Sequence, residues 1–417
     1  MDDPGGRALE KSGLNNVMSI LAGFQGPREV RFKGTKYQHV FTAYSYFGLC
    51  VSHYILICCY LTPLFITDMS FKDMMFFAVP TITSTFSTLR VYYMMWNRSK
   101  IIRLLIKNEE ASEDDYYQDK QEEEIKKWAN TAKVLQPILY FAVCAPIAPW
   151  GVSPIINEIL GNPWGPRKAT IISWYPYDVQ KTHFWVLTVC LQTMAGCYAT
   201  LSNVMFDAVF ICIAARQLAL LIHLKNSFSK IFQVFHVHLN GNVWYSNYNG
   251  EVVERKEIED VVIQRLKYWI KKHQTVLRLL DESQSMYSFP LFLHFCYVGM
   301  VLATGSAAVL KGTLTSMEYY FIGMHLVGLS FTLFIICRIG DYIKIETDEI
   351  TEGLYGQNYF MLSKEQHMLI KNILTAVKQP FVFTVAQAFP LSTETFKSVM
   401  TTTYSFFAMF TQMQHKN

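Results

Sequence analysis

Seven long apolar stretches limit what this chain can fold into more than any other feature. They occupy residues 40–62, 73–96, 134–160, 184–214, 289–311, 318–340 and 389–412. Each is long enough for a membrane helix, which needs about 20 mostly apolar residues. Short linkers such as "KGTLTSME" join full-length apolar runs directly, which disfavours the buried helices of a large soluble protein. The sequence therefore predicts an all-α, polytopic membrane protein with seven transmembrane helices.

The composition excludes several classes of function. Of the residues, 51% are hydrophobic and 17% are charged, and the net charge is only +4, so we expect no nucleic acid partner. All nine cysteines lie inside apolar runs, which disfavours disulfides and zinc ribbons. His236 and His238 lie two residues apart without a nearby cluster of Cys or carboxylate, so we expect no metal site. No catalytic or nucleotide-binding motif appears, so we expect neither an enzyme nor a cofactor.

The distribution of Lys and Arg predicts the orientation. Segments 1–39, 97–133, 215–288 and 338–388 carry 6, 8, 10 and 5 of these residues. The alternate segments 63–72, 161–183, 311–317 and 413–417 carry 1, 3, 1 and 1. Because cytoplasmic loops are enriched in Lys and Arg, the N-terminus is expected in the cytosol and the C-terminus outside the cell. We see no signal peptide in the first forty residues.

The chain divides into four expected regions. Residues 1–39 form a cytosolic N-terminal segment, and 40–340 hold helices one to six with their cytosolic loops. Residues 341–388 form a cytosolic anchor region of helices, and 389–417 hold the seventh helix with a short extracellular tail. Apolar residues recur at helical spacing from Val262 to Leu280, so we expect the fifth span to extend as a helix into the cytosol.

The last helix carries a polar stripe. Steps of three or four residues connect Glu394, Ser398, Thr401, Ser405, Met409 and Gln412, and Thr402 and Met413 lie beside them. Hydroxyl and amide groups along one face are what a pore-lining helix shows, and several copies around an axis would enclose the pore. The same stripe is also typical of a close interface between two membrane helices. The residues alone leave both interpretations open.

Four stretches, taken in order, resemble the insect odorant receptor family. These are "WYPYDVQKTHFWVLTVCLQ" before the fourth span, "YWIKKHQTVLRLLDE", "EITEGLYGQNYF" and the C-terminal "LSTETFKSVMTTTYSFFAMF". The chain departs from the family at Tyr359, where relatives usually have Trp. The resemblance covers most of the chain.

This resemblance implies an odorant-gated, nonselective cation channel without a cofactor. Family members are tetramers in which the seventh helices line one pore, and a tuning subunit pairs with an olfactory co-receptor. The present chain looks like a tuning subunit in the lipid of the plasma membrane, in the dendrite of an olfactory neuron. Aligned with the family, Met409 and Met413 take the positions of the hydrophobic gate, and Gln412 takes that of the polar constriction.

The resemblance also places a pocket for a small volatile organic ligand in the outer half of the helix bundle. The matching residues are Phe76, Phe77, Pro80, Thr81, Ser84, Cys144, Ile147, Ala148, Gly151, Phe184, Leu187, Val189, Leu191, Tyr320, Phe321 and Met324. Such a lining binds a small volatile through buried apolar area and shape.

Two other functions stay open from the residues. One is a seven-helix chemoreceptor that signals through a soluble partner, and the other is a multipass transporter or lipid-modifying enzyme. The transporter would require charged sites at the middle of the membrane. Arg90 and Asp207 lie near the inner ends of their spans, so we interpret them as a structural ion pair or as snorkelling side chains rather than as a proton relay.

Overall fold

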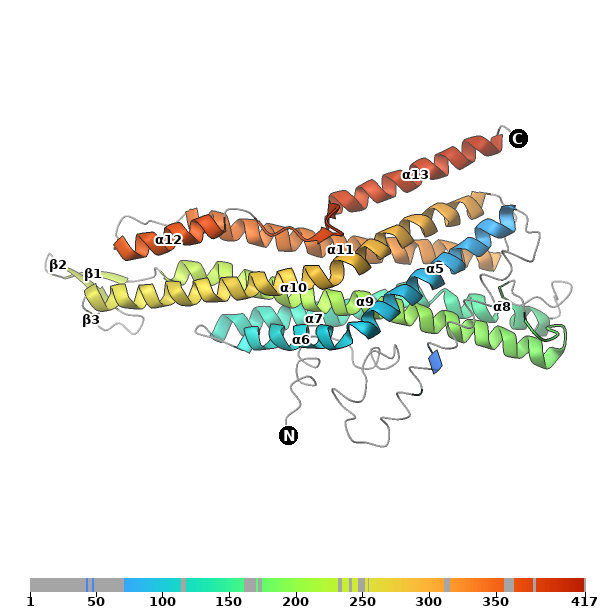
Figure 1. Cartoon of the computed structure of the whole chain (residues 1–417), viewed down its shortest axis with the longest axis horizontal. Coiled ribbons are helices and arrows are strands. Elements are labelled where there is room, and N and C mark those ends of the chain that lie inside the picture. The colour runs from blue at the N-terminus through green and yellow to red at the C-terminus, as the bar shows by residue number, and fades with distance from the viewer. Residues whose placement is uncertain are drawn as a thin grey trace.

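Helices that run side by side make up most of the protein, and Figure 1 shows them as an elongated bundle. The structure is a computed structural model that describes residues 43, 47–48, 71–113, 118–160, 170–171, 175–231, 235–239, 242–246, 252–253, 255–310, 316–355, 364–377 and 380–415. The described helices are α5 (Phe71–Trp96), α6 (Arg98–Glu113), α7 (Gln118–Cys144), α8 (Ile147–Ile159), α9 (Thr182–Ile231), α10 (Arg255–Leu310), α11 (Ser316–Tyr355), α12 (Lys364–Ala376) and α13 (Thr393–His415). The all-α prediction is confirmed.

Helix α9 lies at the centre of the bundle. It is 50 residues long and apolar on all faces, as expected of a helix that is covered on every side. Helices α5, α7, α8, α10 and α11 all pack against it. Its most apolar stretch is 94% buried, so α9 is the element around which the other helices are arranged.

Helix α10 confirms the predicted extension of the fifth span. It continues without a break for 56 residues, and Val262, Leu266, Trp269, Val276 and Leu280 are all buried. The apolar stripe read from the sequence is therefore the face that packs against the bundle. Helix α11 also extends well beyond the predicted span 318–340, into the region expected to be the cytosolic anchor.

The predicted span 134–160 is not one straight helix. Helix α7 ends at Cys144 and α8 begins at Ile147, and the two are bent by 44°. Pro146 and Pro149 explain the break, because proline lacks an N–H donor and its ring obstructs the preceding turn. The bend directs α8 across the end of the bundle where α9 begins (Figure 1).

In the described part of the chain, five short strands accompany the helices. Strands β1 (Phe235–Leu239), β2 (Asn242–Ser246) and β3 (Val252–Val253) form an antiparallel sheet in which Val237 pairs with Trp244. Strands β4 (Thr384–Val385) and β5 (Phe389–Pro390) form a hairpin directly before α13. The predicted span 389–412 therefore starts as a strand, and the helix begins only at Thr393.

Three described helices are long and apolar enough to cross a membrane. They are Thr182–Phe228, Asp260–Val309 and Ser316–Leu354, and α7 with α8 qualifies as one further, bent span. The predicted span 40–62 lies almost wholly outside the described residues. The number of seven spans and their orientation therefore stay predictions.

A buried ion pair joins α5 to α9. The Arg90 guanidinium donates to the carboxylate of Asp207 and to the side-chain oxygen of Asn203, and it lies 4.4 Å from the centre of the Phe206 ring. The side chains of Arg90 and Asp207 are 0% and 2% exposed, and His294 of α10 lies 3.4 Å from the same carboxylate. The expected structural ion pair is therefore present, although it is buried and does not snorkel.

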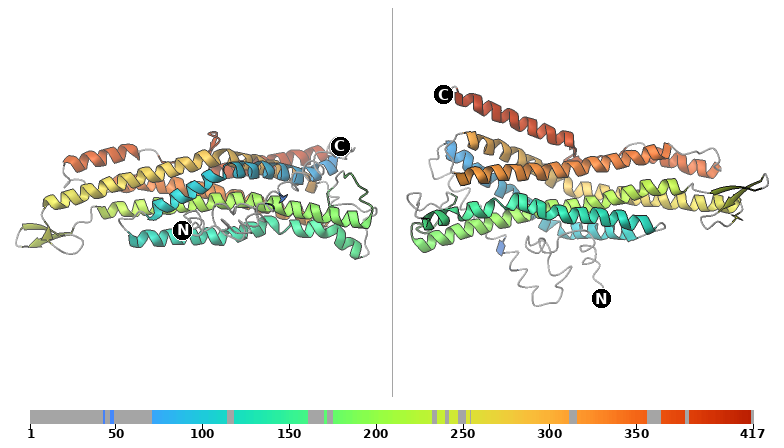
Figure 2. Two further views of the ribbon diagram at one scale, coloured as in Figure 1. Left: turned by 60° about the horizontal axis from the view of Figure 1, so that its bottom comes forward. Right: turned by 180° about the vertical axis from the view of Figure 1, so that it is seen from behind.

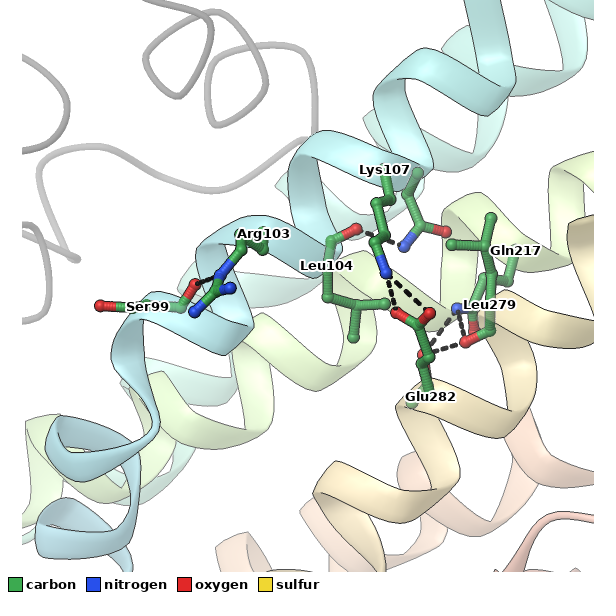
Figure 3. A network of polar contacts seen from close by, with 9 residues as sticks. Ser99, Arg103, Leu104, Lys107, Gln217, Leu279 and Glu282 are labelled. Carbon is green, nitrogen blue, oxygen red and sulfur yellow. Dashed lines mark hydrogen bonds and ion pairs between the residues drawn. The ribbon is translucent and has the colours of Figure 1, made fainter.

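Further polar contacts join α6 and α9 to α10 at another level of the bundle (Figure 3). Lys107 Nζ of α6 donates to both carboxylate oxygens of Glu282 of α10 at 2.7 Å. Gln217 of α9 donates to the Leu279 carbonyl at 3.0 Å and to the Ser283 hydroxyl at 2.6 Å. These contacts fix how the three helices sit against one another at this level of the bundle.

The buried pair generates a prediction about stability. Arg90→Met leaves the Asp207 carboxylate buried without its main partner, which costs about 3–5 kcal/mol. The double variant Arg90→Met with Asp207→Leu removes both charges and should recover most of that loss. Thermal unfolding of the purified protein in lipid nanodiscs measures both. A double variant as unstable as the sum of the two single variants would contradict this account.

Candidate ligand cavity and pore helix

A cavity lies between α5, α8, α9 and α11. These helices come together at the end of the bundle where α9 begins (Figure 1). Its described lining consists of Pro80, Thr83, Ser84, Ile147, Trp150, Gly151, Thr170, Ile171, Gln192, Thr193, Gly196, Ala199, Thr200, Phe321 and His325. The volume open to the centre of a water-sized sphere is about 40 Å³. A cavity that binds benzene has a volume of about 150 Å³, so a volatile of eight to ten heavy atoms requires the helices to move apart.

Five residues predicted for the ligand pocket line this cavity. They are Pro80, Ser84, Ile147, Gly151 and Phe321. The predicted Thr81, Cys144, Phe184, Leu187, Val189, Leu191, Tyr320 and Met324 are absent from its described lining, and the side chains of Phe76, Phe77 and Ala148 lie outside the described part of the chain. On α9, Phe184, Leu187 and Leu191 point away from the face of Gln192 and Gly196, by about 120° on average at 100° per residue.

Apart from Ser84, the polar part of the lining was not predicted. Thr83, Gln192, Thr193, Thr200 and His325 contribute hydroxyl, amide and imidazole groups to the wall. One signal was available, because Gln192, Gly196 and Thr200 follow each other at steps of four and so share one face of α9.

An aromatic column forms one side of the cavity. The rings of Trp150 and Phe321 stack with centroids 4.2 Å apart, and Phe321 stacks in turn on His325 at 5.6 Å. Trp150 comes from α8 and the other two from α11, so the column connects these helices. Stacked rings offer a flat apolar surface to a small ligand.

The loop before α9 closes the cavity on one side. The Gln192 side chain accepts from the Ile171 amide at 3.1 Å and donates to the Ile171 carbonyl at 3.0 Å and to the Tyr175 hydroxyl at 2.9 Å. Thr170 donates to the Gly151 carbonyl at 2.7 Å. Gln192 therefore uses its polar atoms to hold this loop against the helices.

The start of α13 is fixed by α10 and α11. The Asp341 carboxylate of α11 accepts hydrogen bonds from the amide, at 3.0 Å, and from the hydroxyl of Thr393, the first residue of α13. Ser288 of α10 donates to the Thr384 carbonyl and accepts from the Ala386 amide in the hairpin before it. Ala386 and Gln387 have φ of 50° and 56°, which makes this a tight turn.

Helix α13 stands away from the rest of its chain, as Figure 1 and the view from behind in Figure 2 show. Phe396, Val399 and Met400 pack against the core of the bundle. A crevice of about 710 Å³ separates another face of α13, including Thr402 and Phe406, from α10. The bundle holds this helix mainly at its base.

The predicted polar stripe lies on the free side of α13. Glu394, Ser398, Thr401, Ser405, Met409 and Gln412 are all exposed, and the side chain of Met413 is outside the described residues. At about 100° per residue, the centre of the stripe lies roughly opposite the face of Phe396 and Met400. Glu394 and Ser398 also border the crevice toward α10, and the rest of the stripe is uncovered by its own chain.

Comparisons with known proteins agree on one family. The family pattern described as "7tm Odorant receptor" matches residues 70–404. Odorant receptor 67c of Drosophila melanogaster is 22% identical over 252 residues, which cover 60% of this chain and 57% of that protein. The Odorant receptor coreceptor of Anopheles gambiae is 24% identical over 177 residues, covering 40% of this chain and 35% of that one.

A solved structure has the same fold. The insect olfactory receptor OR5 from Machilis hrabei, determined in complex with eugenol, superposes with a TM-score of 0.74 at 14% identity, covering 98% of both chains. The prediction of a polytopic membrane protein is therefore confirmed. The expectation that the chain is not an enzyme agrees with the match to the odorant receptor family pattern.

The contact at the base of α13 generates a prediction. Asp341→Ala removes an acceptor and a negative charge from the start of the helix, at a cost of about 1 kcal/mol. The amides of the first turn of α13 should then exchange with deuterium about fivefold faster, as measured by mass spectrometry. Glu352→Ala removes an exposed acid from the same helix and serves as the control. Equal exchange in the two variants would show that Asp341 does not hold α13.

Proposed function

Because the chain belongs to the odorant receptor family, matched over residues 70–404, we propose that it is an odorant-gated, nonselective cation channel subunit. A small volatile organic ligand would bind in the cavity between α5, α8, α9 and α11. Several seventh helices, of which α13 is one, would line a central pore in a tetramer with the olfactory co-receptor. The observation that carries the proposal is the polar stripe of α13, which is turned away from its own bundle.

The proposal includes the orientation and the location of the chain. The N-terminus and the anchor region 341–388 would face the cytosol, and the cavity would lie in the outer half of the membrane. The apolar surface would contact lipid in the plasma membrane of an olfactory neuron dendrite. Pairing with the co-receptor is supported by the similarity to co-receptor sequences from several insects.

The small size of the cavity gives a reason for gating. A volatile would bind only to a packing of the four helices that is wider than the one described, so binding favours that wider arrangement. A ligand can shift such an equilibrium only as far as its affinities for the two arrangements differ. Burial of apolar ligand area against Trp150 and Phe321 would supply that difference.

Helix α11 provides a direct route from the cavity to the pore helix. It carries Phe321 and His325 in the cavity wall and Asp341 at the base of α13. Asp341 lies sixteen residues after His325, which corresponds to about 24 Å of rigid helix. A displacement of α11 at the cavity would therefore move the point at which α13 is held.

The hydroxyl groups of the stripe suit the passage of cations. The Ser405 hydroxyl donates its proton to the Thr401 carbonyl at 3.0 Å, so its oxygen keeps its lone pairs for water or an ion. Oxygen acceptors along a pore replace part of the hydration shell of a cation. Met409 and Gln412, nearer the outer end, would form the gate and the constriction.

Whole-cell recording tests the proposed function. Cells that express this chain with an insect co-receptor should show a cation current with fast onset when a panel of volatiles is applied. Cells that express the co-receptor alone should not respond to the volatiles that activate cells with both subunits. The current should persist under G-protein blockade. A slow response abolished by that blockade would instead indicate a receptor that signals through a soluble partner.

Two hydroxyl variants test whether α13 lines the pore. Ser405→Ala should change the relative permeability of the odorant-evoked current to Na⁺ and K⁺, because it removes an acceptor from the stripe. Thr403→Val removes a hydroxyl that likewise bonds to a carbonyl of its own helix, that of Val399 at 2.9 Å, but on the opposite side of α13. That variant should leave the permeability ratio unchanged. Equal effects of both variants would place the pore elsewhere.

A further inference from the structure

We propose that His325 selects volatile ligands that carry a hydroxyl group, an inference that rests on the channel function proposed above. His325 lies on α11 in the wall of the cavity and is 2% exposed. Its Nδ1 atom is buried and has no hydrogen-bond partner among the described residues. A buried polar atom that lacks a partner is costly, so a ligand that supplies the partner gains affinity.

The hydroxyls of Thr193 and Thr200 in the same wall each already make one hydrogen bond. They donate to the carbonyls of Val189 and Gly196 at 2.8 Å. The amide of Gln192 is used to hold the loop that closes the cavity. Among the described lining residues, His325 Nδ1 is the one fully buried side-chain nitrogen or oxygen atom without a hydrogen-bond partner, so it gains most from a ligand that donates a proton.

The hydrogen bonds of Thr83 indicate which proton the imidazole carries. The Thr83 hydroxyl donates to the Val79 carbonyl at 2.8 Å, so its oxygen is left as an acceptor. His325 Nε2 lies 3.3 Å from that oxygen and must then carry the proton that is donated to it. The imidazole of His325 contacts Thr83 and Phe321, which are both uncharged. A protonated imidazole would be a buried cation without a charged partner, which is costly. The imidazole is therefore neutral, with a lone pair on Nδ1.

This arrangement distinguishes classes of volatile by their chemistry. A lone pair on Nδ1 accepts a hydrogen bond, so the ligand must donate one. Alcohols and phenols have such a donor, whereas aldehydes, ketones, esters and hydrocarbons do not. The stacked rings of Trp150 and Phe321 would contact the apolar part of the same ligand.

Matched ligands test the inference in the intact complex with the co-receptor. We would record dose–response curves for benzyl alcohol, benzaldehyde and toluene, and for hexanol, hexanal and hexane. One hydrogen bond should make the alcohol of at least one set about three- to tenfold more potent than the aldehyde of the same skeleton. Aldehydes as potent as the alcohols in both sets, or activation only by volatiles without a hydroxyl group, would overturn the inference.

Variants locate the selectivity at His325. His325→Phe keeps an aromatic ring next to Phe321 but removes the acceptor, so the potency ratio of alcohol to aldehyde should fall to about one. Thr200→Val removes a hydroxyl from the same cavity whose proton is already donated to Gly196, and it should leave the ratio unchanged. An unchanged ratio in His325→Phe at normal surface expression would overturn the inference.

A second variant covers the case in which His325→Phe does not reach the cell surface. Thr83→Val removes the acceptor that holds the proton on Nε2, so the ratio should also fall in this variant. An unchanged ratio would again contradict the inference. A wild-type complex that gives no current with any volatile would instead contradict the channel function itself, so the two failures are distinguishable.

Discussion

The burial of α9 on every side is the constraint on which the rest of the structure depends. Because residues 202–221 of this helix are buried on every side, the surrounding helices must cover it there, while part of its first third is exposed. The buried pair of Arg90 and Asp207 then fixes how α5 lies against it, since neither charge is tolerated alone in an apolar interior. The cavity lies where α9 presents small and polar residues to the helices that cover it. These residues are Gln192, Gly196 and Thr200.

The cavity and the pore helix are different kinds of site, and α11 connects them. The residues of one chain enclose the cavity, which is too small for a volatile unless the helices move apart. Binding of a volatile would therefore enlarge the cavity. Helix α13 is held at its base by Asp341 and Ser288, while its polar stripe is left uncovered. A ligand that widened the cavity would therefore act on the helix that holds the base of α13.

The sequence predicted the parts of this arrangement that depend on the pattern of apolar residues along single helices. Val262, Leu266 and Val276 on α10 follow the helical period and are buried, and the stripe from Glu394 to Gln412 lies on one exposed face. Apart from the Arg90–Asp207 pair, contacts between helices were not predicted. Which faces meet depends on how the helices pack in three dimensions. His325 and Gln192 lie in apolar runs that reveal no partner, and Phe184 and Leu187 share their helix with the cavity but not its face. Pro146 indicates a break in the helix, but the long apolar run around it favoured the prediction of one continuous span.

The central claim is that one membrane complex both binds the volatile and conducts the ions. Recording from excised outside-out patches that contain this chain and the co-receptor tests it most directly, because the cytosol and its soluble signalling proteins are removed. The account predicts that a volatile still opens single channels in such patches without GTP, with a latency set by delivery of the ligand. Responses that disappear on excision and return when GTP and cytosolic protein are restored would contradict it.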